Sequence, residues 1–266
     1  MHDLTFLKLG GSLITDKNQP QTVRKEILAR LADEIASARK AQPGLRLILG
    51  HGSGSFGHTA AKKYATRQGV HTADEWLGFA EVWKAARALN QIVVEALQES
   101  SLPLIAFPPS AAVSARDGRV LRWDISPIQA ALSAGLIPLV NGDTIFDEQR
   151  GGTILSTEDL FIYLAGQLNP GRILLAGIEE GVWADFPACT QLIERITPNT
   201  FPSLQAKISG SASVDVTGGM LEKVKSMIEL TQNDPGFQAI IFSGLQHGNI
   251  RSALLGGAPG TRLGMQ

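Results

Sequence analysis

Short apolar runs that each lead into a glycine constrain the fold of this chain more than any other feature. Five of them have the length of a strand, at residues 4–9, 45–49, 136–140, 173–176 and 239–242. Segments with apolar residues at spacings of three and four lie between them, notably residues 24–40 and 74–98, and this period predicts helices. Alternating buried strands and helices predict an α/β fold, a three-layer open αβα sandwich with a largely parallel central sheet.

Composition narrows the class of protein. The chain has 266 residues, of which 44% are apolar and 18% charged, as expected of a globular protein. The net charge of −1 and the absence of a lysine or arginine block predict no nucleic-acid or membrane partner. No apolar run is long enough to span a bilayer, and the first residues do not resemble a secretory signal. The single cysteine, Cys189, fits a reducing compartment, so we expect a cytoplasmic protein.

A glycine-rich loop at residues 50–58 directly follows one of the apolar runs and precedes a helical segment. Closely spaced glycines let backbone N–H groups approach an anion, and the start of a helix adds a positive potential. The spacing Gly52-x-Gly54-x-x-Gly57 also fits a dinucleotide fingerprint. That site needs an acidic residue at the end of the next strand, whereas Asp74 and Glu75 fall at a capped helix start. The residues therefore favour a phosphate group over a dinucleotide.

Lysines accompany other glycine loops. Lys8 lies in an apolar run just before Gly10-Gly11-Ser12, which places an ammonium near a backbone cradle. Lys223 lies one helical turn beyond Gly219, so the helix start and the ammonium can face one anion. Lys17 is an exposed residue on sequence grounds alone. Two predicted hairpins, at residues 112–122 and 144–155, would form a side wall or a lid.

Six short motifs occur along the chain, and their order and spacing together are specific for one protein family. The chain resembles the amino acid kinase superfamily, and within it the isopentenyl phosphate kinase family. The resemblance rests on Lys8 to Ser12, His51 to His58, Asn141-Gly142-Asp143, Leu155 to Asp159, Gly181-Val182-Trp183, and Asp215 to Met220 with Lys223. The Ser55-Phe56-Gly57-His58 ending matters most, because in this superfamily the histidine implies a phosphate-monoester acceptor. Ser53 departs from the family, which usually has glycine or alanine there, and Ile178 and Glu179 depart from its acidic pattern.

The resemblance implies a kinase that uses ATP and Mg²⁺ to convert isopentenyl phosphate into isopentenyl diphosphate. It implies that Lys8 and Lys223 contact the ATP phosphates, that Lys17 stabilises the moving charge, and that Asp159 orients the lysines. His58 would bind the acceptor's phosphate, with Ser53 and Thr157 beside it. The nucleotide would be bound by Gly10, Gly11, Ser12, Gly54, Gly181, Val182, Trp183 and Gly219. The family resemblance also suggests a homodimer. The order of the predicted elements places an acceptor-phosphate-binding lobe at residues 1–170 and an ATP-binding lobe at residues 171–266 of one continuous fold.

An isoprenoid acceptor needs an apolar pocket for its tail. The candidates are Phe79, Val82, Trp83 and Ala86 on one helix face, with Ile145 and Phe146 from a hairpin. Core packing explains such a stripe equally well. Two other functions stay open: a kinase of another small phosphate or phosphonate such as fosfomycin, and a nucleotide or anion sensor without turnover. Keeping Lys8, His58, Asp159 and Lys223 together argues against a sensor, since a binder does not need charge focused on a moving phosphoryl group.

Overall fold

One mixed sheet forms the centre of the molecule. The computed structural model describes residues 4–208, 219–234 and 236–265, with the backbone alone for residues 58–60, 62 and 233. Within these residues the sheet order is β12 (Arg195–Ile196), β14 (Thr261–Leu263), β13 (Gln238–Ser243), β9 (Arg172–Gly177), β1 (Leu4–Leu9), β2 (Arg46–His51), β6 (Ile137–Asn141) and β3 (Leu104–Ala106). Neighbouring strands run parallel except β13 and β14, which are antiparallel.

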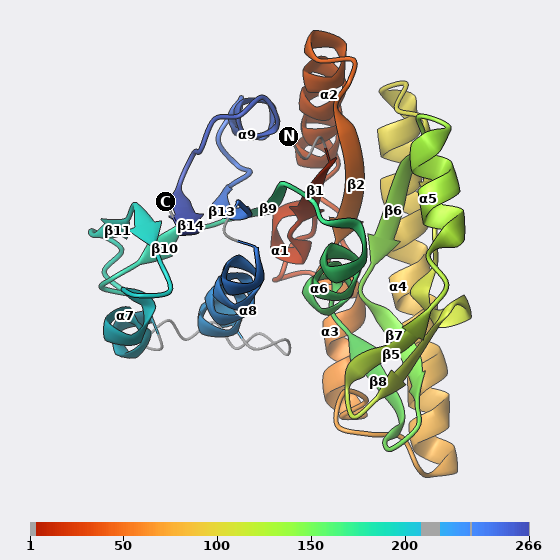
Figure 1. Ribbon diagram of the computed structural model, residues 1–266. Coiled ribbons are helices and arrows are strands. Elements are labelled where there is room, and N and C mark those ends of the chain that lie inside the picture. Colours follow the sequence, from red (N-terminus) through yellow and green to blue (C-terminus); the bar gives the residue numbers. More distant parts are fainter. Residues whose placement is uncertain (1–3, 209–218, 235, 266) are drawn as a thin grey trace.

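Helices cover both faces of this sheet, which confirms the predicted three-layer α/β class (Figure 1). The helical elements of the described residues are α1 (Gly11–Ile14), α2 (Lys25–Ala41), α3 (Gly54–Lys63), α4 (Ala73–Glu99), the 3₁₀ turn η1 (Pro109–Ala111), α5 (Ser126–Ser133), α6 (Thr157–Leu168), α7 (Phe201–Ile208), α8 (Gly219–Asn233) and α9 (Asn249–Leu254). No helix in the described part of the chain combines the length and apolar character needed to cross a bilayer.

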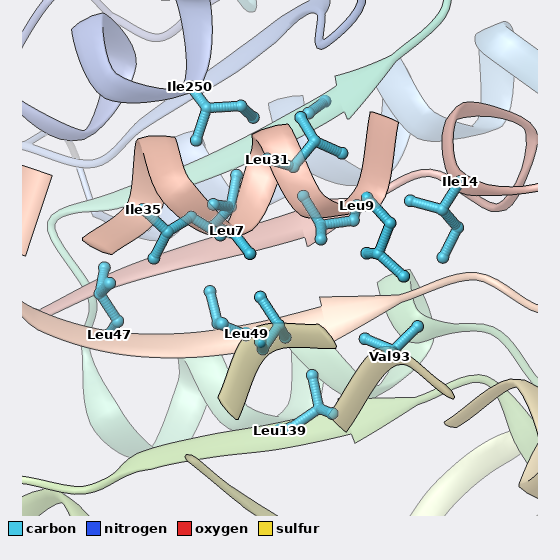
Figure 2. Packing of buried hydrophobic residues seen from close by; sticks show 14 of the residues in the cluster. Leu7, Leu9, Ile14, Leu31, Ile35, Leu47, Leu49, Val93, Leu139 and Ile250 are labelled. Atoms are coloured by element: carbon cyan, nitrogen blue, oxygen red, sulfur yellow. The ribbon is translucent and has the colours of Figure 1, made fainter. Parts of the chain in front are cut away.

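The alternation of side chains along β1 decides which residues meet which layer. Leu7 and Leu9 point to one face and pack with α2, α4 and α9; Figure 2 shows Leu31 and Ile35 of α2 beside them. Phe6 points to the other face, where it packs against Phe161 of α6 with ring centroids 5.0 Å apart. Because successive strand residues alternate, Lys8 shares the face of Phe6 and is directed toward the α6 layer.

The two predicted hairpins pair as a second sheet. Its order is β5 (Arg119–Trp123), β4 (Val113–Arg116), β7 (Asp143–Asp147) and β8 (Gly151–Leu155), with β4 and β7 parallel. Figure 1 shows this sheet alongside α4, and α4 packs against β7. A small ribbon of β10 (Val182–Trp183) and β11 (Leu192–Ile193) lies toward the other end of the molecule. The two predicted hairpins therefore combine into one sheet beside α4.

Most long elements match their sequence predictions. The five apolar runs form β1, β2, β6, β9 and β13, and the two long periodic segments form α2 and α4, with ends shifted by at most a few residues. Helix α4 begins with a capping box in which Thr72 and Glu75 satisfy each other's backbone N–H groups. That cap confirms that Asp74 and Glu75 belong to a helix start, so the strand-end acid of a dinucleotide site is missing there.

Candidate active site

A pocket opens at the carboxyl ends of β1, β2 and β9, where ligands bind in open α/β sheets. Its walls come from the loops after these strands, the start of α6 and the start of α8. The pocket is lined by Lys8, Gly10, Gly11, Ser12, Leu13, Lys17, Gly52, Ser53, Gly54, Gly142, Ile154, Leu155, Ser156, Thr157, Glu158, Leu175, Ala176, Gly177, Ile178, Glu179, Met220, Lys223 and Ile241. Residues from distant parts of the chain, singled out as phosphate ligands, therefore share one pocket.

Two glycine loops touch each other at the floor of the pocket. Gly54 has φ +49°, a left-handed conformation, and a Cβ there would lie 2.1 Å from the Thr15 hydroxyl oxygen. A Cβ on Gly11 would lie 2.3 Å from the Gly54 nitrogen. Only glycine fits such a contact, which is the physical reason for both residues. Close packing of the two loops brings the residues after β1 and β2 onto one binding surface.

Lys8 pairs with Glu158, a residue that the sequence analysis did not single out. The two side chains form a close ion pair in which each is about nine-tenths buried. Burial raises the pKa of the Glu158 carboxyl, but attraction to Lys8 and Lys223 outweighs it, so this pKa lies below its ordinary value. The second carboxylate oxygen, Oε2, is buried and makes no hydrogen bond within the described residues. Glu158 is thus ionised and draws both ammonium groups toward the pocket.

Asp159 has a different set of contacts from the one expected. Its Oδ2 accepts hydrogen bonds from the backbone N–H (2.8 Å) and hydroxyl (2.7 Å) of Ser156, the N-cap of α6. The same oxygen pairs with Arg67 at 3.4 Å. The resemblance assigned the orienting of the lysines to Asp159, whereas the carboxylate beside Lys8 belongs to Glu158. One helical residue apart, the two carboxylates point about 100° away from each other, so Asp159 turns back to the cap.

Lys17 and Lys223 complete the charge of the pocket. Lys17 is exposed and lines the pocket from the loop between the bridged residues Thr15 and Val23. Lys223 lies in the first turns of α8, which begins at Gly219 as predicted. The upstream part of that motif, residues 215–218, lies outside the described residues. Three lysines and a helix start facing one pocket form a site for a highly charged anion.

His51 is a buried structural residue, in keeping with its sequence interpretation. Its Nε2 lies 3.0 Å from Asn90 Oδ1 of α4, and its Nδ1 lies 3.1 Å from the Gly52 oxygen. Burial lowers the pKa of the imidazole more than these hydrogen bonds raise it. Through these two contacts the ring of His51 holds the start of the glycine loop against α4. The carbonyl oxygen of His51 also accepts a hydrogen bond from Thr157 Oγ1 at 2.6 Å, which connects β2 to α6.

Several residues singled out in the sequence lie away from this pocket or outside the description. The backbone of His58 lies in α3, but its side chain is outside the described residues. Gly181 and Val182 are not part of the lining; the buried Val182 donates its backbone N–H to Thr261 Oγ1 at 2.8 Å. Trp183 reaches the pocket indirectly, because its Nε1 donates to Glu179 at 3.0 Å. Ile178 and Glu179, which depart from the acidic pattern of the family, therefore lie in the wall of the pocket.

The residues proposed for an isoprenoid tail gather between α4 and β7. Phe79 and Phe146 have ring centroids 5.4 Å apart, and Trp76 joins them at 5.2 and 5.8 Å. Phe146 is 59% exposed, and Trp83 is 39% exposed and donates its Nε1 hydrogen to Ser110. The others, Val82, Ala86 and Ile145, are buried in the core. None of these residues lines the pocket described above, so their role as a tail site stays a prediction.

Carboxylates are too few here to form a metal site of their own. The described part of the chain holds no group of three or more His, Cys, Asp or Glu side chains that could bind a metal ion. Buried Asp143, the first residue of β7 and the neighbour of Gly142, has its pKa raised by burial, against hydrogen bonds from Ser110 and Thr144 that lower it. Oxygen atoms of a bound phosphate compound are ligands of the kind that Mg²⁺ takes beside one or two carboxylates.

Comparison with known proteins identifies the family. The family model described as the amino acid kinase family matches residues 3–243. The chain belongs to the amino acid kinase family. Isopentenyl phosphate kinase of Methanocaldococcus jannaschii is 36% identical over 266 residues, which cover 98% of this chain and 98% of that protein. The enzyme of the same name from Methanothermobacter thermautotrophicus is 31% identical, covering 95% of this chain and 96% of that one.

A solved structure extends the comparison to the whole architecture. X-ray structures of isopentenyl phosphate kinase superpose on this amino acid kinase with a TM-score of 0.83 and 29% sequence identity. The match covers 98% of this chain and 99% of the other. The amino acid kinase fold predicted from the motifs is thereby confirmed.

Proposed function

We propose that this protein is an ATP-dependent kinase that phosphorylates isopentenyl phosphate to isopentenyl diphosphate. The observation that carries the proposal is the single pocket in which two glycine loops, the start of α8 and three lysines converge. Two relatives of more than 30% identity that match nearly the whole chain carry the name of that activity. Positioning two anions and neutralising charge on a moving phosphoryl group is the main task of such a catalyst.

The chain's own residues divide this task. Lys8, fixed by Glu158, and Lys223, at the start of α8, would contact the ATP phosphates, and backbone N–H groups from Gly10 to Ser12 would add donors. Lys17 would stabilise charge on the transferring group. Mg²⁺ would arrive with ATP and neutralise phosphate oxygens. Because the acceptor's phosphate is already ionised near neutral pH, the site needs no strong general base.

The acceptor would lie on the side of α3. His58 would bind its phosphate, Ser53 and Thr157 line the pocket on that side, and the apolar residues between α4 and β7 would receive the tail. Residues 1–170 would then form the acceptor-binding lobe and residues 171–266 the ATP-binding lobe, with Gly181, Val182, Trp183 and Gly219 on the nucleotide side. A homodimer and a cytoplasmic location complete the proposal; the first rests on the family resemblance and the second on the single cysteine.

An assay of ADP release with Mg²⁺ and ATP tests this function. Isopentenyl phosphate, dimethylallyl phosphate, fosfomycin and no acceptor are compared in parallel. We expect saturable turnover with isopentenyl phosphate that is lost in His58→Ala and kept in His71→Ala, an exposed histidine at the start of α4. Turnover with fosfomycin alone would mean that the acceptor is a phosphonate and not isopentenyl phosphate. ATP binding without turnover on any acceptor would make the protein a sensor and contradict the proposal.

A further inference from the structure

We propose that Arg67 is a positioning residue for phosphoryl transfer, which it affects through Asp159 and the first turn of α6. The inference rests on the proposed kinase function. Arg67 lies in the connection between α3 and α4 and does not line the pocket. It pairs with Asp159, which in turn holds the N-cap Ser156. Through these contacts a side chain outside the pocket reaches the turn that carries Glu158.

The contacts of Asp159 show why that turn depends on it. Its Oδ2 accepts both polar hydrogens of Ser156, and its own N–H donates to Ser156 Oγ at 3.1 Å. This reciprocal capping box fixes the backbone of the residues that follow the cap. Two of them face the pocket: Thr157, bonded to the His51 carbonyl, and Glu158, paired with Lys8. A shift of the cap therefore moves the carboxylate that orients Lys8.

The guanidinium of Arg67 contributes charge to this cap. The Arg67 and Asp159 side chains are 30% and 29% exposed, so their ion pair is partly shielded from water. Nη1 of Arg67 is buried and makes no hydrogen bond within the described residues, so the pair with Asp159 is what offsets its burial. Without Arg67, the Asp159 carboxylate would lose the positively charged partner that helps to hold it against the cap of α6.

The backbone of Arg67 is held by the β7–β8 hairpin. Its carbonyl oxygen accepts hydrogen bonds from Arg150 Nη1 at 3.2 Å and from Thr153 Oγ1 at 3.0 Å. Both donors belong to the β7–β8 hairpin and its turn. These contacts fix the segment after α3 to the β7–β8 hairpin and to the start of α6. Helix α3 is the one that carries His58. Arg67 links the acceptor side of the site to the charge cluster on the ATP side.

Kinetics and hydrogen exchange of Arg67→Met test the inference. We expect kcat to fall about fivefold and the KM for ATP to change less than about twofold, since the lost interaction acts on positioning rather than on binding. Backbone amides of residues 156–160 should exchange faster. Arg67→Lys, which keeps the charge, should recover part of kcat. Arg116→Met is the matched control, because its ion pair with Glu148 is exposed, does not involve the cap of α6, and neither residue lines the pocket.

A double-mutant cycle separates positioning from general stability. In the Asp159→Asn background, Arg67→Met should change kcat by less than about 1.5-fold, because the path through the carboxylate is already broken. Equal kcat and equal amide exchange of residues 156–160 in Arg67→Met and Arg116→Met would overturn the inference. In that case the proposed function would still stand if the unmodified protein turns over isopentenyl phosphate. If the unmodified protein shows no turnover, the proposed function fails, and the exchange of residues 156–160 alone decides: faster exchange supports the link and unchanged exchange overturns it.

Discussion

Replacing Glu158 by glutamine removes the negative charge from the buried pair with Lys8 and changes almost nothing in size. Both side chains are at most a tenth exposed, 10% for Lys8 and 9% for Glu158. Removing one partner of such a pair costs about 3–5 kcal/mol of folding free energy. The amide oxygen of glutamine still accepts a hydrogen bond and the pocket admits water, so we expect a loss of about 2 kcal/mol.

The sign of the pH dependence follows from the lowered pKa of Glu158. A carboxyl whose pKa is depressed on folding stabilises the protein above its ordinary pKa of 4.5, and this contribution is lost as the pH falls through the folded value. The stability difference between the original protein and Glu158→Gln should therefore be full at about pH 7 and shrink below about pH 4.5. Denaturant unfolding at several pH values measures it.

The same variant should lose catalysis. With the charge that attracts Lys8 and Lys223 gone, we expect kcat to fall about tenfold to a hundredfold, which corresponds to about 1.4–2.7 kcal/mol of transition-state stabilisation. Glu148→Gln is the control, because its pair with Arg116 is 40% and 55% exposed and is worth less than about 1 kcal/mol. Equal stability and kcat in the two variants would refute the role given to Glu158.

Three further predictions concern the loops of the pocket. Gly54→Ala should lose at least about 2 kcal/mol of stability in denaturant unfolding and should bind ATP more weakly in calorimetry, because φ of Gly54 is +49° and the space for a Cβ is already filled. Gly44→Ala is the control: nothing lies near a Cβ at that position, so it should lose neither stability nor ATP affinity. Lys17→Met should lower kcat about a hundredfold with unfolding free energy within about 0.5 kcal/mol, and the exposed Lys40→Met should leave both unchanged. The pKa of His51 is lowered on folding, so the unfolded chain takes up the proton first as the pH drops below 6.5, and this lowers the stability of the folded protein. That contribution to the pH dependence should be absent in His51→Gln.

The parts of the fold that the sequence predicts are those whose signal is local. An apolar run such as residues 4–9 can be stable only inside a sheet, and the glycine after it marks the strand end that faces the pocket. Strands β3, β12 and β14 have two or three residues each, too few for any period to show. These short strands are stable because they pair at the edges of a sheet built from the longer strands.

The same difference between local signals and those that depend on the whole fold applies to the residues of the site. Glycines and lysines near strand ends and helix starts identify Lys8, Gly11, Gly54 and Lys223, because their chemistry is visible in the sequence and the fold brings these ends together. The choice between Glu158 and Asp159 is not visible, since both are acids in the first turn of α6. Which one meets Lys8 depends on the rotation of the helix over the sheet. Residue type alone does not separate the two acids; only the spacing of Ser156 and Asp159, which fits a capping box, assigns Asp159 to the helix start and leaves Glu158 for the pocket.

Phosphorus-31 NMR of a mixture of the protein with Mg²⁺, ATP and isopentenyl phosphate tests the central claim most directly. The account predicts that the monophosphate signal of the acceptor is replaced by the two coupled signals of a diphosphate monoester, in step with the conversion of ATP to ADP. Lys8→Met, which removes the ammonium held by Glu158, should leave the acceptor signal unchanged over the same period. Conversion of ATP to ADP and free phosphate without a diphosphate product, or full product formation by Lys8→Met, would contradict the account.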